Sequence, residues 1–173
     1  MMSHEEAMKL ALNEAKKSEA QGEVPIGAVV LDEAGMVIGV GHNMTESWND
    51  PTAHAEIMAI RDAVRKVGDW RLIGCRLYVT LEPCLMCAGA IQQSRIEHVI
   101  YGAPSPKSGA LESLLRAYDV PGLNHYPQVT AGIEAVECAM ILADFFRDKR
   151  GNPVVRELRR DVRVVEGARL ESE

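Results

Sequence analysis

The sequence has no apolar run near the ~20 residues that a membrane-spanning helix requires. The first residues, MMSHEEAMKLALNEAKK, hold no basic segment followed by an apolar core, so no secretion signal is visible. The sequence also contains no internal repeat, no low-complexity segment and no sign of a second folded domain. These absences argue against a membrane, secreted or repeat protein, and we expect one cytoplasmic domain.

Cysteine and phenylalanine are both scarce, with four and two residues respectively. Four cysteines without a secretion signal indicate a reducing compartment, where thiols serve as metal ligands, nucleophiles or buried packing groups. A chain of 173 residues buries roughly 70% of the surface that it exposes when unfolded, so it needs no disulfides. The shares of apolar (47%) and charged (25%) residues exclude wholesale disorder.

The net charge of −6 argues at first against a nucleic-acid partner, but the charge is unevenly distributed. Residues 1–146 carry 11 basic and 19 acidic side chains, whereas residues 147–163 carry 7 basic and 3 acidic ones. The basic residues of this stripe are Arg147, Lys149, Arg150, Arg156, Arg159, Arg160 and Arg163. Such a stripe is either a solvated helix face or a surface that contacts phosphates, where Lys and Arg release condensed counterions.

Hydrophobic spacing and turn residues predict alternating helices and strands. The predicted helices are 5–18, 51–67, 83–94 and 132–149, and the predicted strands are 24–31, 36–40, 76–81, 98–101 and 126–130. Ser3 opens the first helix, the turn at 32–35 makes a hairpin of the first two strands, and Pro51 and Pro83 fall in first helical turns. This order indicates helices packed on a mixed sheet. We assign residues 1–150 to the domain and 151–173 to a tail that is partly helical or frayed.

Two motifs carry the residues that can perform chemistry: Pro51-Thr52-Ala53-His54-Ala55-Glu56 and Pro83-Cys84-Leu85-Met86-Cys87. One helical turn places Cys84 and Cys87 on the same face, where the positive helix N-terminus favours thiolates. Two thiolates and His54 suit Zn²⁺ and leave its fourth position open, as in catalytic rather than structural zinc sites. Glu56 would line the same pocket, take a proton from the zinc-activated water and pass it to a leaving nitrogen.

Taken alone, the cysteine pair is also compatible with a redox pair or with half of a structural zinc site. A redox pair is disfavoured because no thioredoxin-like context precedes it. A structural site needs a fourth ligand, and no paired ligand spacing is shown by the candidates Cys75, Cys138, His42, His98 and His125. Cys75 and Cys138 fit packing positions. In contrast, His-x-Glu followed about 30 residues later by Pro-Cys-x-x-Cys is the signature of zinc-dependent nucleobase deaminases.

With these motifs the sequence resembles the cytidine and deoxycytidylate deaminase superfamily, and within it the bacterial tRNA-specific adenosine deaminases. The resemblance covers Glu23–Val29, Asn43, Asp50–Ile57, Leu77–Ala90, Ser94–Ile96, Lys107–Gly109, Gly122–His125 and Asp144–Arg147. It implies a three-layer α/β/α fold around a five-stranded mixed sheet, a homodimer and one Zn²⁺ per subunit. The implied reaction converts adenosine to inosine at the wobble position of an arginine tRNA anticodon stem-loop, where zinc-bound hydroxide attacks C6 of the flipped adenine.

The resemblance also assigns roles residue by residue. It gives His54, Cys84 and Cys87 to zinc and Glu56 to proton transfer. The substrate contacts that it implies are Asn43 with the flipped nucleotide, Val24, Pro25 and Ala55 with the base, Ser105 and Lys107 in a loop beside it, and Phe145, Arg147, Lys149 and Arg150 with the anticodon loop. Phe145 and its neighbour Phe146 suit stacking of unpaired bases, and the alternative, which applies less to Phe145 than to Phe146, is that both rings belong to the core.

One residue departs from the family pattern. Family members usually carry an acidic residue at the position of Ser105, near the ribose beside the target base. Ser105 is shorter and neutral. We therefore expect weaker discrimination between RNA and DNA than an acidic residue would give.

Two other functions remain open at this point. A small-molecule deaminase acting on guanine, cytosine or a nucleoside would use the same zinc chemistry, but a free base offers no phosphates to the basic stripe. A non-catalytic RNA-binding or zinc-stabilised interaction protein would have no need of Glu56 beside an open zinc position.

Overall fold

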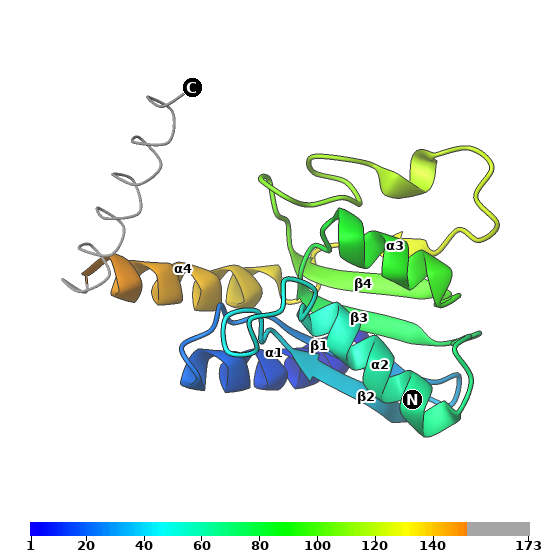
Figure 1. The fold of residues 1–173 in the computed structure, drawn as a ribbon, viewed down its shortest axis with the longest axis horizontal. Helices are drawn as coiled ribbons and strands as arrows, with labels where there is room; N and C mark the ends of the chain where they lie inside the picture. The colour runs from blue at the N-terminus through cyan, green and yellow to red at the C-terminus, as the bar shows by residue number, and fades with distance from the viewer. Residues whose placement is uncertain (152–173) are drawn as a thin grey trace.

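The computed structural model describes residues 1–151 of the chain (Figure 1). In chain order the elements are α1 (His4–Ala20), β1 (Gly27–Leu31), β2 (Val37–His42), α2 (Ala55–Val67), β3 (Arg76–Leu81), α3 (Leu85–Gln93), β4 (His98–Ala103), the 3-10 turn η1 (Ala117–Asp119), β5 (Gln128–Thr130) and α4 (Ala135–Gly151). The predicted tail, with Arg156, Arg159, Arg160 and Arg163, lies outside the described residues. None of the helices within 1–151 has the length and apolar character needed to cross a bilayer.

The strands form one mixed sheet in the order β2-β1-β3-β4-β5. β1 pairs antiparallel with both β2 and β3, whereas β3, β4 and β5 run parallel. A turn closes the predicted hairpin, since Asp32 N donates to Met36 O and Gly35 adopts a φ of 82°. The predicted five-stranded mixed sheet is therefore confirmed.

Helices cover both faces of this sheet, and Figure 1 shows α2 and α3 in front of it. On that face Leu77 and Val79 of β3 pack with apolar residues of α2 and α3. On the opposite face Tyr78 packs with apolar residues of α1 and with Cys138 of α4. Successive β3 residues thus alternate between two cores, as the pleat of a strand requires, and the three-layer α/β/α prediction is confirmed.

Ser3 begins α1 as predicted. Its hydroxyl accepts a hydrogen bond from Glu6 N at 3.1 Å, and the Glu6 carboxylate accepts one from Ser3 N at 2.8 Å. This reciprocal pair satisfies two of the amides that a helix start leaves without partners.

The starts of α2 and α3 differ from the prediction. α2 begins at Ala55 rather than Pro51, because Asp50 holds Thr52 through its carboxylate and leaves His54 extended as the N-cap. α3 begins at Leu85 rather than Pro83, with Cys84 as an extended N-cap. Neither proline therefore occupies a first helical turn, and both segments that carry the predicted zinc ligands enter their helices later than expected.

Other boundaries shift by a few residues. β2 continues to His42 and β4 to Ala103, where ladder pairs with β1 and β3 persist. β5 begins at Gln128, two residues later than predicted. α4 begins at Ala135 rather than 132, because Gly132 (φ 84°) and Glu134 (φ 52°) take left-handed conformations that a helix cannot contain.

Glycines allow α2 to lie directly on β2. A Cβ at Gly41 would sit 2.4 Å from both the carbonyl oxygen of Ala55 and the amide nitrogen of Ala59, and a Cβ at Gly39 would sit 2.3 Å from the carbonyl oxygen of Ala59. All three distances are far below van der Waals contact. The first turns of α2 are therefore fixed against the sheet by backbone contact.

Gly41→Ala should lower the free energy of unfolding by about 2–3 kcal/mol, because the new methyl group overlaps the α2 backbone. Gly89→Ala is the matched control, since nothing lies within 4 Å of a Cβ there. In the middle of α3 this change should stabilise by about 0.5–1 kcal/mol. Denaturant unfolding measures both, and equal stability of the two variants would contradict the contact.

Candidate active site

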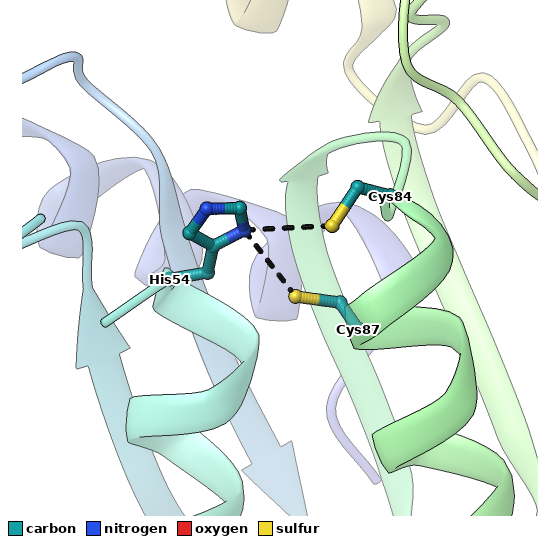
Figure 2. A group of neighbouring side chains, drawn as sticks. All are labelled: His54, Cys84 and Cys87. Carbon is teal, nitrogen blue, oxygen red and sulfur yellow. Dashed lines mark hydrogen bonds between the residues drawn. The ribbon is translucent and has the colours of Figure 1, made fainter. Parts of the chain in front are cut away.

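Two helix N-termini meet at one end of the sheet. The pairs Gly27 with His42 and Ala28 with Val79 bring the end of β2, the start of β1 and the end of β3 together. α2 and α3 begin just beyond that end. Figure 2 shows the result: His54 at the start of α2 points its ring toward the sulfurs of Cys84 and Cys87 at the start of α3.

The three side chains fit one zinc ion. His54 Nδ1 lies 3.5 Å from the Sγ atoms of both Cys84 and Cys87. Tetrahedral zinc with ordinary bond lengths of about 2.3 Å to sulfur and about 2.0 Å to nitrogen requires an N···S separation of about 3.5 Å. Within residues 1–151 this is the one group of three or more His, Cys, Asp or Glu donors gathered within 4.8 Å. The predicted zinc ligands are brought together.

The three side chains share protons through hydrogen bonds. A hydrogen bond from the Cys87 thiol, assisted by His54, lowers the pKa of Cys84 to about 4. The same bond, with burial, raises the pKa of Cys87 well above its usual range. The hydrogen bond to Cys84 raises the pKa of His54. One thiolate is therefore already present at neutral pH, and zinc binding would release the remaining protons.

Glu56 lies next to this group in the first turn of α2. Its side chain is 4% exposed and reaches the Cys87 thiol. Burial raises the pKa of Glu56 to about 7. A carboxyl group with a pKa near neutrality can both accept and release a proton, as the proton-transfer role predicted for Glu56 requires.

A pocket of about 270 Å³ adjoins His54. Val24, Asn43 and Ala55, all expected to contact the base, line it, and Pro25 is buried between two lining residues. Asn43 Oδ1 accepts from the Thr45 hydroxyl at 2.7 Å, and Asn43 Nδ2 donates to Val24 O at 3.3 Å. A second hydrogen on Nδ2 is left for a ligand. The volume lies near the lower end for small-ligand pockets, roughly 300 Å³, and suits a single base.

Comparison with known proteins identifies the family. Residues 1–103 match the zinc-binding region of cytidine and deoxycytidylate deaminases. The chain belongs to this deaminase family. The match includes the zinc-ligand trio, Glu56 and the pocket residues, so this deaminase is an enzyme with a zinc cofactor.

Relatives of this deaminase are similar over most of their length. A tRNA-specific adenosine deaminase of Haemophilus influenzae is 47% identical over 146 residues, 84% of each chain. A solved structure from a study of A-to-I editing by tRNA:A34 deaminases is 49% identical with a TM-score of 0.76, covering 79% of this chain and 98% of that one. A guanine deaminase structure from Bacillus subtilis is 34% identical with a TM-score of 0.56, covering 70% and 87%.

Two predicted contacts lie in the loop after β4. Ser105 is only 8% exposed, and its hydroxyl is 2.9 Å from that of Ser108. Lys107 is exposed. The deaminase therefore presents a cation here, while the hydroxyl of Ser105 is already paired within the loop.

The other predicted contacts lie in the last turns of α4. Phe145 is 7% exposed and belongs to the interior, whereas Phe146 is 40% exposed. Lys149 lies over the Phe145 ring at 5.0 Å and donates to Gly22 O at 3.1 Å. Arg147 pairs with Asp144 at 2.7 Å, and Arg150 Nε donates to Phe146 O at 3.2 Å. The exposed ring available for stacking is thus Phe146 rather than Phe145.

Sequence reasoning missed several residues around the site. Four pocket-lining residues were not assigned: Glu23, Ile26, Thr45 and Glu46. Glu82, beside the cysteine motif, was also left without a role. Glu23 and Glu82 are each 2% exposed. The available signal was a charged residue directly before the base-contact pair Val24-Pro25 and another directly before Pro83, because a buried carboxylate needs partners.

The remaining cysteines and histidines take structural positions. Cys75 and Cys138 are buried, as predicted, and burial raises the pKa of each thiol. His42 pairs with Glu14, His98 with the Thr130 hydroxyl and His125 with Ile96 O. Within the described residues these side chains do not join the metal group.

Cys87→Ala should abolish stoichiometric zinc binding, because it leaves two ligands where three are needed to hold the ion. Cys75→Ala removes a buried cysteine that is not a ligand and should keep about one zinc per chain. Elemental analysis of dialysed protein measures both. Full zinc occupancy in Cys87→Ala would refute the ligand set.

Proposed function

We propose that this deaminase converts adenosine to inosine at the wobble position of an arginine tRNA anticodon. The relatives named as tRNA-specific adenosine deaminases and tRNA:A34 deaminases support a tRNA substrate. The observation that carries the proposal in this chain is the position of the basic end of α4 relative to the pocket.

Lys149 joins that basic end to the pocket wall. Its hydrogen bond to Gly22 O places the last turn of α4 beside the segment that continues into Glu23 and Val24, both of which line the pocket. Arg147 and Arg150 lie on the same exposed turns. A base that enters the pocket as part of an RNA loop would bring its neighbouring phosphates to these cations, and a free base would not.

The chemistry combines zinc with Glu56. Zinc, when bound, supplies an activated water for attack on the adenine ring. The Glu56 carboxylate takes a proton from the nucleophile and delivers it to the departing amino group. Burial raises the pKa of Glu56 to about 7, which makes both proton transfers feasible at neutral pH. Water is the second substrate, and ammonia leaves.

The pocket residues hold the base. Val24, Pro25 and Ala55 supply apolar contact, and Asn43 Nδ2 offers a hydrogen bond to the flipped nucleotide. Lys107 and Ser105 would contact the backbone on one side of the base. The exposed Phe146 offers a stacking surface to an unpaired neighbour, with Phe145 supporting the turn beneath Lys149.

We further propose a homodimer formed next to the site. Leu85 and Met86 in the first turn of α3 are exposed, and so are Leu114 and Leu115 in the segment joined to Pro83 by the hydrogen bond from Ala110 N. Neighbouring exposed apolar side chains of this kind favour an interface.

Residues 1–150 would form the catalytic domain of each subunit. The four free cysteines favour a reducing compartment, which supports a cytoplasmic location.

A deamination assay tests the substrate. Zinc-loaded protein should form inosine at the wobble position of an arginine tRNA anticodon stem-loop and should not turn over guanine, cytosine or adenosine. Chromatography of the digested products reads the outcome. Turnover of free bases alone would replace the proposal with a small-molecule deaminase, the activity of the Bacillus subtilis relative. No turnover by zinc-loaded protein would favour a non-catalytic role.

Glu56→Ala should reduce turnover of the stem-loop by at least about 10²-fold, because no other group replaces its proton transfer. Zinc content should stay near one per chain, since Glu56 is not a ligand. The rate is measured under single-turnover conditions beside zinc analysis. Retained activity would rule out the role given to this carboxylate.

Ser105→Asp should raise the preference for RNA over DNA. The wild-type residue is neutral, and its hydroxyl is paired with Ser108. A carboxylate at this position can accept a hydrogen bond from a 2′-hydroxyl, which only RNA carries. The ratio of RNA turnover to DNA turnover is measured with matched hairpins. The same ratio in wild type and Ser105→Asp would refute this prediction.

A further inference from the structure

Glu82 is a buried carboxylate to which the chemistry above gives no task. It follows β3 directly and precedes Pro83 and Cys84. Within the described residues no Lys, Arg or His forms an ion pair with it, although its side chain is 2% exposed. A buried charge needs compensation, so its partners reveal what it does.

The partners are all in residues 104–115, here called the 104–115 loop. Oε2 accepts hydrogen bonds from the consecutive amides of Leu111, Glu112 and Ser113 at 3.2, 3.1 and 3.1 Å. Oε1 accepts from Ser105 N at 3.3 Å and from the Ser113 hydroxyl. Backbone amides that converge on one anion form a nest, and here the anion is part of the protein.

Several features show that the 104–115 loop is shaped around this carboxylate. A Cβ at Gly109 would lie 2.3 Å from Glu82 Oε2, so only glycine fits there. Both oxygens of Glu82 act only as acceptors, and together they receive five hydrogen bonds. The carboxylate is therefore held as an anion by the same groups that it orders.

The loop also touches the metal-binding segment. Ala110 N donates to Pro83 O at 2.9 Å, directly before the ligand Cys84. Glu82 N donates to Ala103 O at 2.9 Å, directly before the loop. One residue thus connects the turn that presents the zinc ligands with the loop that carries Ser105 and Lys107.

We propose that Glu82 is a positioning residue for substrate binding, which holds the 104–115 loop at a fixed position relative to the metal-binding turn. The proposal rests on the proposed function in one respect, namely that this loop contacts the RNA. Glu82 does not line the base pocket, and its side-chain hydrogen bonds go to the 104–115 loop rather than to the zinc ligands. Its loss should therefore weaken binding of the stem-loop more than it slows the chemical step.

Glu82→Gln in the full chain tests this, because it keeps the side-chain shape and removes acceptor charge. Hydrogen exchange at the amides of Leu111, Glu112 and Ser113 should become at least roughly tenfold faster, since a charged hydrogen-bond acceptor is lost. The KM for the stem-loop should rise by roughly tenfold while kcat changes by less than about threefold and zinc stays near one per chain. Glu97→Gln, an exposed change at the opposite end of β4, is the matched control and should leave every readout unchanged.

The outcomes separate the proposal from its alternatives. Unchanged exchange and unchanged KM would overturn it. Loss of zinc or of kcat at constant KM would instead assign Glu82 to the metal-binding turn. If hydrogen exchange becomes faster in Glu82→Gln but the wild-type protein deaminates no RNA, Glu82 still holds the loop in place and only the proposed function is refuted.

Ser113→Ala is a milder variant for the case in which Glu82→Gln does not fold. It removes only the hydroxyl bond to Glu82. Exchange and KM should move in the same direction by about two- to fivefold, the effect of one hydrogen bond. No movement of either quantity would overturn the proposal.

Discussion

Helix α2 lies on β2 with glycines at the contact, and the position of the catalytic groups depends on that approach. Gly39 and Gly41 leave room for the α2 backbone where any side chain would overlap it. The first residues of α2, which include Glu56, are thereby held close to the end of the sheet where α3 also begins. His54 can reach Cys84 and Cys87 only because both helix starts are set against the same strand ends.

Much of this arrangement could be predicted from the residues. Periodicity and turn residues located the α-helices and strands of residues 1–151 but not the 3-10 turn η1. The His54, Glu56, Cys84 and Cys87 pattern identified the metal site, because ligand chemistry permits few alternatives. The starts of α2 and α3 were misplaced, because proline is favoured in a first turn but the extended His54 and Cys84 are the N-caps instead. The pocket walls and the loop around Glu82 could not be predicted, since they depend on contacts between segments tens of residues apart.

The net negative charge of the chain does not describe its surface, because several acidic side chains are buried. Four of its glutamates, at positions 14, 23, 56 and 82, are almost entirely inside the protein. Glu14 holds Lys17 and His42, Glu23 accepts from Ser47 N, and Glu82 orders a loop. The exposed surface therefore carries fewer carboxylates than the composition alone indicates.

Lys149 fastens the last described turn of the chain to Gly22, beside the pocket. The first residues lie elsewhere: Met1 is next to Gly35, at the far end of the β1–β2 hairpin. Figure 1 shows the start of the chain and the end of α4 on opposite sides of the molecule. The start of the chain and the end of α4 are consequently unequal as points of attachment. A label, surface tether or fused domain joined at the start of the chain lies away from the pocket. One joined at the end of α4 begins beside the pocket wall, next to Gly22 and Glu23.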